Sequence, residues 1–370
     1  MKKEILFVVD EQMYGGISVV LTTILKKLDY KNINVDVLIL HNRGNAIEKE
    51  SLPKEVNIIY GSKFFSSIDY TISSAIKSKN IRIIYHKIQT VLGLKTGLIK
   101  NRIKKERKKI LKKKYDIEIA FKDGFCALFT ACGDSTKKIN WLHTSYDICD
   151  NTGKYRKLFV EVYEKIDQIV AITEGAAESF NKIYHLENKT QIIENLVDDQ
   201  EIIRKSKIEN IEFEQDKLNL ISVGRVASAK AYPRLLEQFA KLKKEGKAEN
   251  VVLRIVGDGD EMPIVQQMIK ENQLEEQVKL LGYLENPYPY VVKSDMLVLA
   301  SIYEGLGMVL LEAILLGIPC FSTKVSSVEK TLNDGNFGMI VENSEQGIYE
   351  GNRRAGKRKR NIKRCLDRSY

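Results

Sequence analysis

Residues 296–322, with the sequence MLVLASIYEGLGMVLLEAILLGIPCFS, contain the pattern that decides the fold. A short apolar run at 296–300 predicts a buried strand, and the glycine-bracketed turn around Glu304 leads into a helical period at 308–316. A second short apolar run follows at 319–322. A strand, a helix and a further strand in this order are typical of a parallel sheet with crossover helices on its faces.

The same alternation continues over most of the chain. Further strands are predicted at 5–9, 35–40, 56–59, 117–121, 139–142, 168–172, 218–223, 251–256 and 278–281. Helical periods are predicted at 17–28, 233–244 and 263–272, and a polar, strand-poor passage at 195–215 separates the two halves. The sequence therefore predicts an α/β protein with two doubly wound, Rossmann-like domains, residues 1–195 and 196–350, that face a central cleft.

Length and composition exclude several classes of protein. A chain of 370 residues is too long for one compact core, and 44% hydrophobic with 29% charged residues is typical of globular proteins. No apolar run approaches the roughly 18–20 residues needed to cross a bilayer, and the run at 5–9 is too short for a signal peptide, so we expect a cytoplasmic protein. The five cysteines lack C-x-x-C spacing, which argues against a disulfide framework and a structural zinc site.

The positive charge of the chain is concentrated in two segments. Residues 351–370 hold nine basic side chains and one acidic one, a net charge of +8, so the total of +10 leaves only +2 for the other 350 residues. That balance excludes a nucleic-acid-binding domain, and we expect 351–370 to be a disordered or aberrant basic tail. The segment 100–114, with ten Lys or Arg and one Glu, predicts either a solvated helix face or a patch that faces an anionic membrane.

Polar and glycine-rich clusters follow the predicted strands, at Gly15-Gly16, Gly224-Arg225, Gly257-Asp258-Gly259 and Glu304-Gly305. Ligands of doubly wound sheets bind at the carboxyl ends of the strands. Glu304 and Glu312 lie eight positions apart, which is about 12 Å along a helix and close to the distance between the ribose and the sugar ring of an extended nucleotide-sugar. Carboxylates accept hydrogen bonds from vicinal hydroxyls, and the N–H groups at a helix start can receive a diphosphate.

The stretch from Glu304 to Glu312, followed by Ala313, Gly317 and Pro319, resembles the E-x7-E motif of retaining glycosyltransferases with the GT-B fold, in particular glycosyltransferase family 4. Other segments of this sequence are also similar to the pattern of that family. They are residues 222–225 with Lys230, residues 256–259, Gly282-Tyr283, Gly15-Gly16 and residues 141–143. The resemblance runs from residue 1 to about 341. Ala231 stands where the family usually has Gly, and Pro233 where an acidic residue is common.

The resemblance implies a role for each matching residue. Arg225 and Lys230 would hold the diphosphate, Glu312 the ribose hydroxyls and Glu304 the hydroxyls of the donor sugar. The remaining donor-side residues would be Gly15, Gly16, Asp258, Gly282, Tyr283, Gly305, Leu306, Gly307 and Met308. His143 would contact the donor sugar or the acceptor, and Asp123 is an acceptor-side candidate. Ordinary packing for Tyr283, a structural role for His143 and a solvated surface for Arg225 and Lys230 stay open as alternatives.

The resemblance also implies an activity. A retaining transferase of this kind moves a hexose from a nucleotide-sugar, a UDP-sugar by family frequency, to a lipid-linked precursor of a surface polysaccharide such as a capsule, at the inner face of the membrane. It needs no metal and no other cofactor. The alternatives are a nucleotide-sugar epimerase on the same fold, a non-catalytic scaffold at the membrane, and a divalent metal site at Asp258-Gly259-Asp260. The chain has neither a G-x-G-x-x-G after its first strand nor a P-loop, which excludes nicotinamide enzymes and P-loop NTPases.

Overall fold

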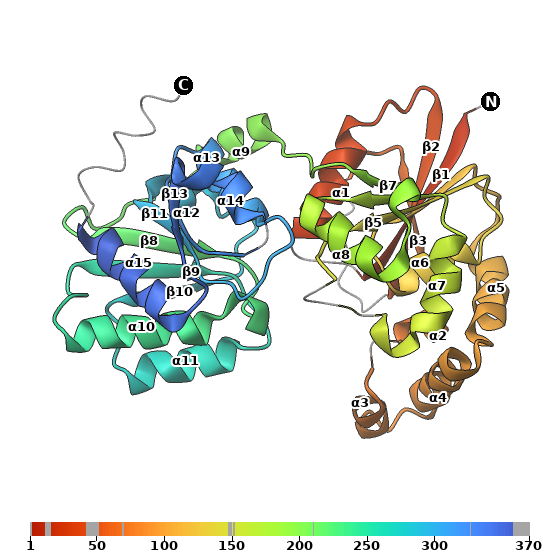
Figure 1. The fold of residues 1–370 in the computed structure, drawn as a ribbon, viewed down its shortest axis with the longest axis horizontal. Coiled ribbons are helices and arrows are strands. Elements are labelled where there is room, and N and C mark those ends of the chain that lie inside the picture. Colours follow the sequence, from red (N-terminus) through yellow and green to blue (C-terminus); the bar gives the residue numbers. More distant parts are fainter. Residues whose placement is uncertain are drawn as a thin grey trace. The chain divides into compact units, whose positions relative to one another are not determined.

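The chain folds into two compact α/β units in the computed structural model, which describes residues 2–11, 16–41, 52–68, 70–146, 150, 152–209, 211–325 and 327–357 (Figure 1). The first domain comprises Met1–Leu196 and the second Val197–Tyr370. The predicted division at 195/196 lies one residue from this boundary. Each domain is built on its own parallel sheet and has its own core, as the alternation of short apolar runs and helical periods predicts.

The first domain is a seven-stranded sheet in the order β3-β2-β1-β4-β5-β6-β7. Its strands are β1 (Lys3–Glu11), β2 (Ile33–His41), β3 (Val56–Tyr60), β4 (Ile117–Ala120), β5 (Lys137–Leu142), β6 (Gln168–Ala171) and β7 (Thr190–Ile192). All neighbouring strands pair in parallel. Both faces of a parallel sheet are covered, and β2 accordingly reads as a nearly continuous apolar run that is buried from Val35 onward.

In the part of the first domain that the structure describes, eight α-helices connect these strands. They are α1 (Gly16–Lys27), α2 (Lys63–Ser66), α3 (Ile72–Lys77), α4 (Ile81–Thr96), α5 (Ile99–Ile110), α6 (Phe125–Ala131), α7 (Arg156–Glu164) and α8 (Glu174–Tyr184). Aromatic side chains fill much of the core, for example Phe65 against Phe129 and Tyr163 against Phe180. The helices α3 and α4 are a finding of the structure, because the sequence pattern of that stretch did not predict them.

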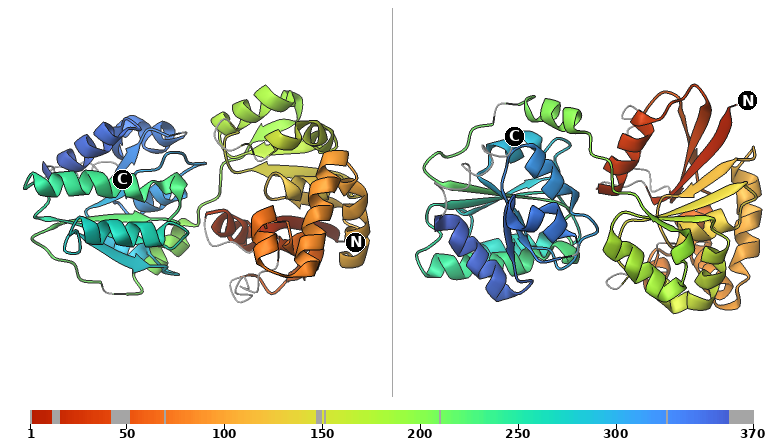
Figure 2. Two further views of the ribbon diagram at one scale, coloured as in Figure 1. Left: turned by 90° about the horizontal axis from the view of Figure 1, so that it is seen from below. Right: turned by 45° about the horizontal axis from the view of Figure 1, so that its top comes forward.

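The second domain is a six-stranded sheet in the order β10-β9-β8-β11-β12-β13. Its strands are β8 (Leu218–Val223), β9 (Val251–Val256), β10 (Val278–Gly282), β11 (Met296–Leu299), β12 (Cys320–Thr323) and β13 (Gly338–Val341). Its helices are α9 (Asp199–Ser206), α10 (Tyr232–Lys244), α11 (Met262–Glu271), α12 (Tyr288–Lys293), α13 (Met308–Leu315), α14 (Val328–Thr331) and α15 (Glu345–Lys357). Helices α10, α11 and α15 cover one face of this sheet and α12, α13 and α14 the other (Figures 1 and 2). This arrangement confirms the predicted doubly wound fold class.

Each sheet has one point at which the strand order reverses. In the second domain the chain runs from β8 outward to β9 and β10, and then returns to the other side of β8 to form β11. In the first domain the corresponding pair is β1 and β4. The loops that follow such a pair diverge to opposite faces of the sheet and leave a crevice between them, where doubly wound proteins bind ligands.

The structure differs from the sequence-based prediction at both ends of the second domain. Helix α9 lies inside the passage expected to be a linker, with Asp198 as its N-cap. At the other end, α15 continues through residues 351–357, which the prediction assigned to the tail. Gly351, Asn352 and Ala355 are buried there. The remaining tail residues, 358–370, lie outside the described residues.

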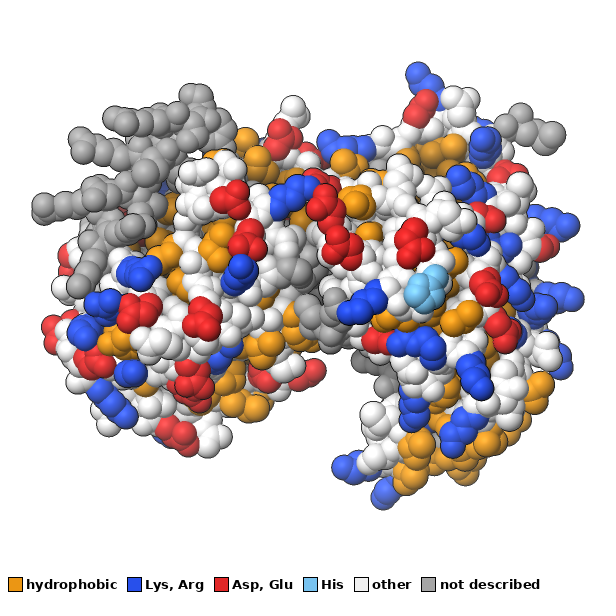
Figure 3. Space-filling view, viewed as in Figure 1, with side chains coloured by type: hydrophobic (Ala, Val, Ile, Leu, Met, Phe, Trp, Pro, Cys, Tyr) orange, Lys and Arg blue, Asp and Glu red, His pale blue; other side chains and the backbone are white. Residues whose placement is uncertain are grey.

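The mixture of acidic and basic side chains on the surface agrees with the small net charge of residues 1–350. Figure 3 shows acidic and basic side chains interspersed on the visible face of each domain. Within the part of the chain that the structure describes, no helix is both long and apolar enough to span a bilayer.

The packing of α15 yields a stability prediction. A Cβ added at Gly351 would lie 2.3 Å from the Phe321 ring, so Gly351→Ala forces the core of the second domain apart. We expect it to lower the free energy of unfolding by about 1–3 kcal/mol. Gly175 in α8 is the matched control, because a Cβ there meets nothing within 4 Å, and Gly175→Ala should stabilise the protein by about 0.5–1 kcal/mol. Denaturant unfolding measures both, and an unchanged midpoint for Gly351→Ala would show that α15 is not packed.

Candidate active site

An ion pair joins the two loops at the switch point of the second domain. The Nζ atom of Lys230 lies 2.6 Å from Oε1 of Glu304, although the two residues are 74 positions apart. Lys230 ends a short 3-10 turn (Ser228–Lys230) after β8, and Glu304 lies in the loop after β11. Both side chains are largely buried, with 20% and 11% of their surfaces exposed. The hydroxyl of Ser301 also donates to Oε1 of Glu304.

The loop that carries Glu304 is fixed by contacts with several other segments. The Ile302 N–H donates to the carbonyl of Ala229 at 2.8 Å, which joins this loop directly to the turn that carries Lys230. The Thr323 hydroxyl, at the end of β12, donates to the carbonyl of Ser301 at 2.7 Å. These bonds satisfy backbone groups of the loop and hold Glu304 at its position before any ligand arrives.

Arg234 and Asn343, which no pattern in the sequence indicated, support the same loop. Arg234 in α10 donates to the carbonyl of Ala300 at 2.9 Å and to Oδ1 of Asn343 at 2.7 Å. The Asn343 amide donates in turn to the carbonyl of Ile302 at 2.9 Å. Neither residue belongs to a recognisable motif, because each acts on backbone atoms of a segment far away in the sequence.

The glycines of this site allow two loops to approach each other. A Cβ at Gly257 would lie 1.9 Å from the carbonyl oxygen of Gly224, and a Cβ at Gly259 would lie 2.3 Å from that of Val226. Because the two backbones are this close, the Val226 N–H donates to the carbonyl of Asp258 at 2.9 Å. Gly257 and Gly259 are therefore glycines because a side chain at either position would collide with the loop after β8.

The two departures from the family pattern fit the observed turn. Ala231 adopts a left-handed conformation with φ 51° and ψ 41°, which explains why glycine is favoured there. Pro233 lies in the first turn of α10, where its missing N–H costs no helical hydrogen bond.

The second glutamate of the motif lies in a different environment from the first. Glu312 is in α13, and burial raises its pKa to about 7, while the charge of Lys230 and a hydrogen bond from the Tyr288 hydroxyl act in the opposite direction. Burial also raises the pKa of Tyr288, as does the nearby charge of Glu312. Tyr288, in α12, is another residue of the site that the sequence analysis missed.

The other predicted donor-side residues lie on the surface or in backbone positions of the second domain. Arg225 and Asp258 are exposed, and no ion pair of Arg225 is found among the residues that the structure describes. Tyr283 is 53% exposed, and the carbonyl of Gly282 accepts a bond of 2.7 Å from the Gly257 N–H. The carbonyl of Gly305 accepts from the Ser327 hydroxyl at 3.1 Å. Residues 305–308 thus form the entry to α13, with Gly307 as its N-cap.

Asp258-Gly259-Asp260 has the conformation of a turn. Oδ1 of Asp258 accepts a hydrogen bond of 2.7 Å from the next N–H, that of Gly259. Among the described residues, no three His, Cys, Asp or Glu side chains converge as the ligands of a metal ion would.

The first domain has its own polar cluster at the carboxyl ends of β4 and β5. Asp123 follows β4 and is buried, burial raises its pKa, and its carboxylate accepts a hydrogen bond from Tyr146. Lys122 forms an ion pair with Asp10 at the end of β1. Gly16 begins α1 close to the same edge in sequence, whereas Gly15 lies outside the described residues.

His143 is a buried, neutral histidine in this cluster. Burial lowers its pKa to about 3, and its ring packs against Phe121 at 4.9 Å and beside Trp141 at 6.5 Å. The carbonyl of Phe121 accepts a hydrogen bond from the ring, and Nε2 has no partner among the described residues. A neutral imidazole of this kind can accept a hydrogen bond from a hydroxyl at Nε2. The surroundings therefore suit both a structural histidine and a ligand of a sugar hydroxyl.

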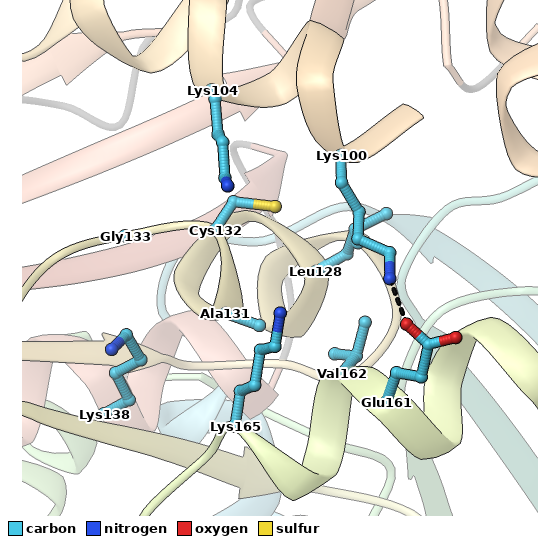
Figure 4. Close-up of a pocket in the computed structure, with 10 residues that line it drawn as sticks. All are labelled: Lys100, Lys104, Leu128, Ala131, Cys132, Gly133, Lys138, Glu161, Val162 and Lys165. Atoms are coloured by element: carbon cyan, nitrogen blue, oxygen red, sulfur yellow. Dashed lines mark hydrogen bonds and ion pairs between the residues drawn. The ribbon is translucent and has the colours of Figure 1, made fainter. Parts of the chain in front are cut away.

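A pocket of about 320 Å³ lies at the opposite edge of the first sheet, between α5, α6 and α7. Its charged lining residues are Lys100, Lys104, Lys138, Lys165 and Glu161, and Lys100 reaches Glu161 across its mouth (Figure 4). Lys138 is the second residue of β5 and Lys165 precedes β6, so the pocket adjoins the amino ends of the strands. It is therefore separate from the polar cluster around Asp123 and His143.

Comparison with known proteins finds a family similarity in the second domain. Residues 203–351 match the family described as Glycosyl transferases group 1. An N-acetylgalactosaminyltransferase of Campylobacter jejuni, which acts on a diphospho-undecaprenol-linked sugar, is 32% identical over 194 residues, 51% of each chain. The N-acetyl-alpha-D-glucosaminyl L-malate synthase of Bacillus anthracis is 26% identical over 215 residues, 57% of this chain and 55% of that protein. The chain thus spans about half the length of these relatives.

Solved structures show the fold of the whole chain. HepE of Anabaena, in complex with UDP and glucose, is 16% identical and superposes with a TM-score of 0.71 over 98% of this chain and 92% of its own. WaaG, a glycosyltransferase of lipopolysaccharide biosynthesis, superposes with a TM-score of 0.62 over 98% and 93% at the same identity. The chain therefore has the GT-B fold, and its residues 203–351 are similar to the family described as Glycosyl transferases group 1.

Proposed function

We propose that this protein transfers a hexose from a UDP-sugar to a lipid-linked precursor of a surface polysaccharide, with retention of the anomeric configuration. The observation that carries the proposal is the contact between Lys230 and Glu304 at the switch point of the second sheet. Glu312 is also near, because the charge of Lys230 lowers its pKa against the effect of burial. One cation between two carboxylates suits a donor that presents hydroxyl groups on both sides of a diphosphate.

In this proposal each group of the second domain recognises one part of the donor. Lys230 and the exposed Arg225 bind the diphosphate, together with the N–H groups at the start of α13. Glu304 accepts hydrogen bonds from the sugar hydroxyls, and Glu312 accepts them from the ribose. Before the donor binds, Lys230 and Glu304 compensate each other's charge, which makes their burial tolerable. The diphosphate then takes over part of the hydrogen bonding of Lys230.

The proposed chemistry breaks the bond between the anomeric carbon and the diphosphate oxygen, and forms a bond from the same carbon to the acceptor oxygen. The departing diphosphate receives the proton of the acceptor hydroxyl on the same face, so no protein base is required. Negative charge grows on the leaving oxygen, and Lys230 and Arg225 stabilise it through fixed positive charge. We propose that the reaction needs no metal ion.

The acceptor side of the proposal involves the first domain. Nε2 of His143 is buried and has no hydrogen-bond partner among the described residues, and in this proposal it accepts a hydrogen bond from a sugar hydroxyl once substrate is bound. Asp123 lies in the loop after the neighbouring strand. The lipid-linked acceptor is supported by the name of the Campylobacter relative and by relatives of lipopolysaccharide and amylovoran biosynthesis. UDP is supported by the complexes of HepE with UDP and with UDP-glucose. Action at the cytoplasmic face of the membrane, including capsule synthesis, follows as part of the same proposal.

Glu304→Gln tests the site directly. The change keeps the size of the side chain but removes the charge that faces Lys230, and we expect kcat/KM to fall about 100-fold or more. A thermal-shift screen of nucleotide-sugars first identifies the donor. The rate of UDP release in the presence of acceptor then measures kcat/KM. Glu275→Gln is the control, because Glu275 is exposed in the same domain. Unchanged turnover by Glu304→Gln would refute the site, and turnover that needs no acceptor would instead favour the epimerase or a hydrolase.

Glu312 predicts a pH dependence of donor binding. A carboxyl group with a pKa of about 7 is about one-tenth ionised at pH 6 and nine-tenths at pH 8, so donor affinity should rise about tenfold over this interval. The four histidines of the chain all lie before residue 197, so none in the second domain masks this titration. Calorimetric titration with UDP-glucose at several pH values measures the effect, and Glu312→Gln should abolish it. A flat profile for the unmodified protein would contradict the proposed role of Glu312.

Metal independence has a separate test. We expect activity to be unchanged after removal of divalent cations with EDTA, because the proposed charge stabilisation comes from Lys230, Arg225 and a helix start. Loss of activity that Mg²⁺ or Mn²⁺ restores would contradict this, and would direct attention to Asp258 and Asp260.

A further inference from the structure

The helices α3 and α4 of the first domain carry a continuous set of exposed apolar side chains. On α4, Ile81, Tyr85, Ile88 and Leu92 are 82%, 56%, 53% and 56% exposed, and their spacing places them on one stripe of the helix. The preceding helix adds Ile72 and Ile76, and the following loop adds Leu98, each more than half exposed. We call these seven residues the apolar ridge. Figure 3 shows hydrophobic side chains gathered over this part of the molecule.

Packing within the domain does not explain the apolar ridge. The residues of α4 that are buried are Thr90, Gly93 and Leu94. At about 100° per residue, this buried face lies on the side of the helix opposite to the exposed stripe. Gly93 allows α5 to approach it, since a Cβ there would lie 3.2 Å from the Cα of Ile99. The helix is thus apolar on two sides, and its domain uses only one of them.

The segment that bears the apolar ridge is strongly basic. Residues 70–105 contain nine Lys or Arg and no Asp or Glu. Four of these cations, Lys77, Lys79, Arg82 and Lys95, lie on or between α3 and α4, are exposed, and form no ion pair with the described residues. An exposed apolar stripe flanked by uncompensated cations is the pattern of a helix that lies in the interface of an anionic membrane.

The segment 100–114, expected from the sequence as a patch that faces a membrane, differs from the ridge in its charge balance. Six of its ten cations pair with acidic side chains of this chain, namely Lys100 with Glu161, Arg102 and Lys109 with Glu106, Arg107 with Glu118, Lys113 with Glu4 and Asp36, and Lys114 with Asp134. Much of its positive charge is therefore compensated, and Arg107 is buried. On α3, on α4 and between them, in contrast, Lys77, Lys79, Arg82 and Lys95 stand beside the exposed apolar side chains without an ion pair to the described residues.

We propose that the apolar ridge docks the protein on an anionic lipid bilayer, with α4 lying in the interface and its flanking cations on the headgroups. A second copy of this chain is a poorer partner, because two such surfaces would bring the same cations together without acids to compensate them. The proposal rests on this surface alone and not on the proposed transferase activity. If both hold, the docking places the enzyme on the membrane that contains its lipid-linked acceptor.

The test is binding of the full chain to vesicles. We expect sedimentation with vesicles of phosphatidylglycerol and phosphatidylcholine mixed equally, weaker binding at high salt, and little binding to phosphatidylcholine alone. The combined variant Ile81→Gln, Ile88→Gln and Leu92→Gln should lower the affinity at least about tenfold. The matched control is Ile203→Gln, Ile208→Gln and Ile264→Gln in the second domain, whose residues are 40%, 58% and 49% exposed. This control should bind as the unmodified protein does.

Two further measurements make the result specific. Tyr85→Trp should show a blue-shifted emission with these vesicles and quenching by brominated lipid, because the ring enters the interface. The variant Glu304→Gln should bind vesicles normally, which separates docking from catalysis. Circular dichroism and the unfolding midpoint of the Gln variants should be unchanged, since the altered side chains are exposed.

Three outcomes would overturn the proposal. One is vesicle binding by the ridge variant that equals that of the unmodified protein. Another is the absence of binding by the unmodified protein to any vesicle that contains phosphatidylglycerol. The third is a dimer of the unmodified protein that the ridge variant converts to a monomer without any vesicle binding, which would assign the ridge to contact between copies.

Discussion

The ion pair between Lys230 and Glu304 is the interaction on which the candidate site depends. It brings the loop after β8 to the loop after β11, at the single place where the strand order of the second sheet reverses. Two opposite charges can be largely buried there because each compensates the other, and because Ser301 and the bond from Ile302 to Ala229 complete the hydrogen bonding. The free domain therefore already holds a cation and a carboxylate at the position where a donor would need them.

The two glutamates of the motif differ because of their surroundings. Glu304 has a lysine in direct contact, whereas Glu312 lies among apolar residues of α13 and accepts a hydrogen bond from the Tyr288 hydroxyl. Burial consequently raises the pKa of Glu312 toward neutrality. Identical side chains eight positions apart thus lie in different surroundings, one in contact with a fixed countercharge and the other buried in an apolar helix.

The first domain combines a well-packed aromatic core with helices that bury little of their surface. Phe65, Phe129, Tyr163 and Phe180 pack beneath the sheet, while α3 buries only Ala75 and α4 keeps an entire apolar side exposed. Apolar area left in water is a cost unless a partner covers it, which is why this face indicates an interaction surface. The pairing of 100–114 with local acids shows, in contrast, that a basic sequence can be satisfied within its own fold.

The sequence by itself determined the alternation of strands and helices, the division into two halves, and the position of the motif from Glu304 to Glu312. These features depend on the spacing of apolar residues and on turn residues, which act over short distances along the chain. Several helices were not predicted, among them α3, α4 and α9, although Thr71, Asn80 and Asp198 cap their N-termini. The packing of residues 351–357 was not predicted either, because it depends on contacts with distant parts of the second domain. Only the tertiary structure decided that Arg234, Asn343 and Tyr288 support the site and that the Lys230 side chain meets Glu304. Such contacts join residues far apart in the chain, and no local spacing records which distant backbone or carboxylate a side chain will reach.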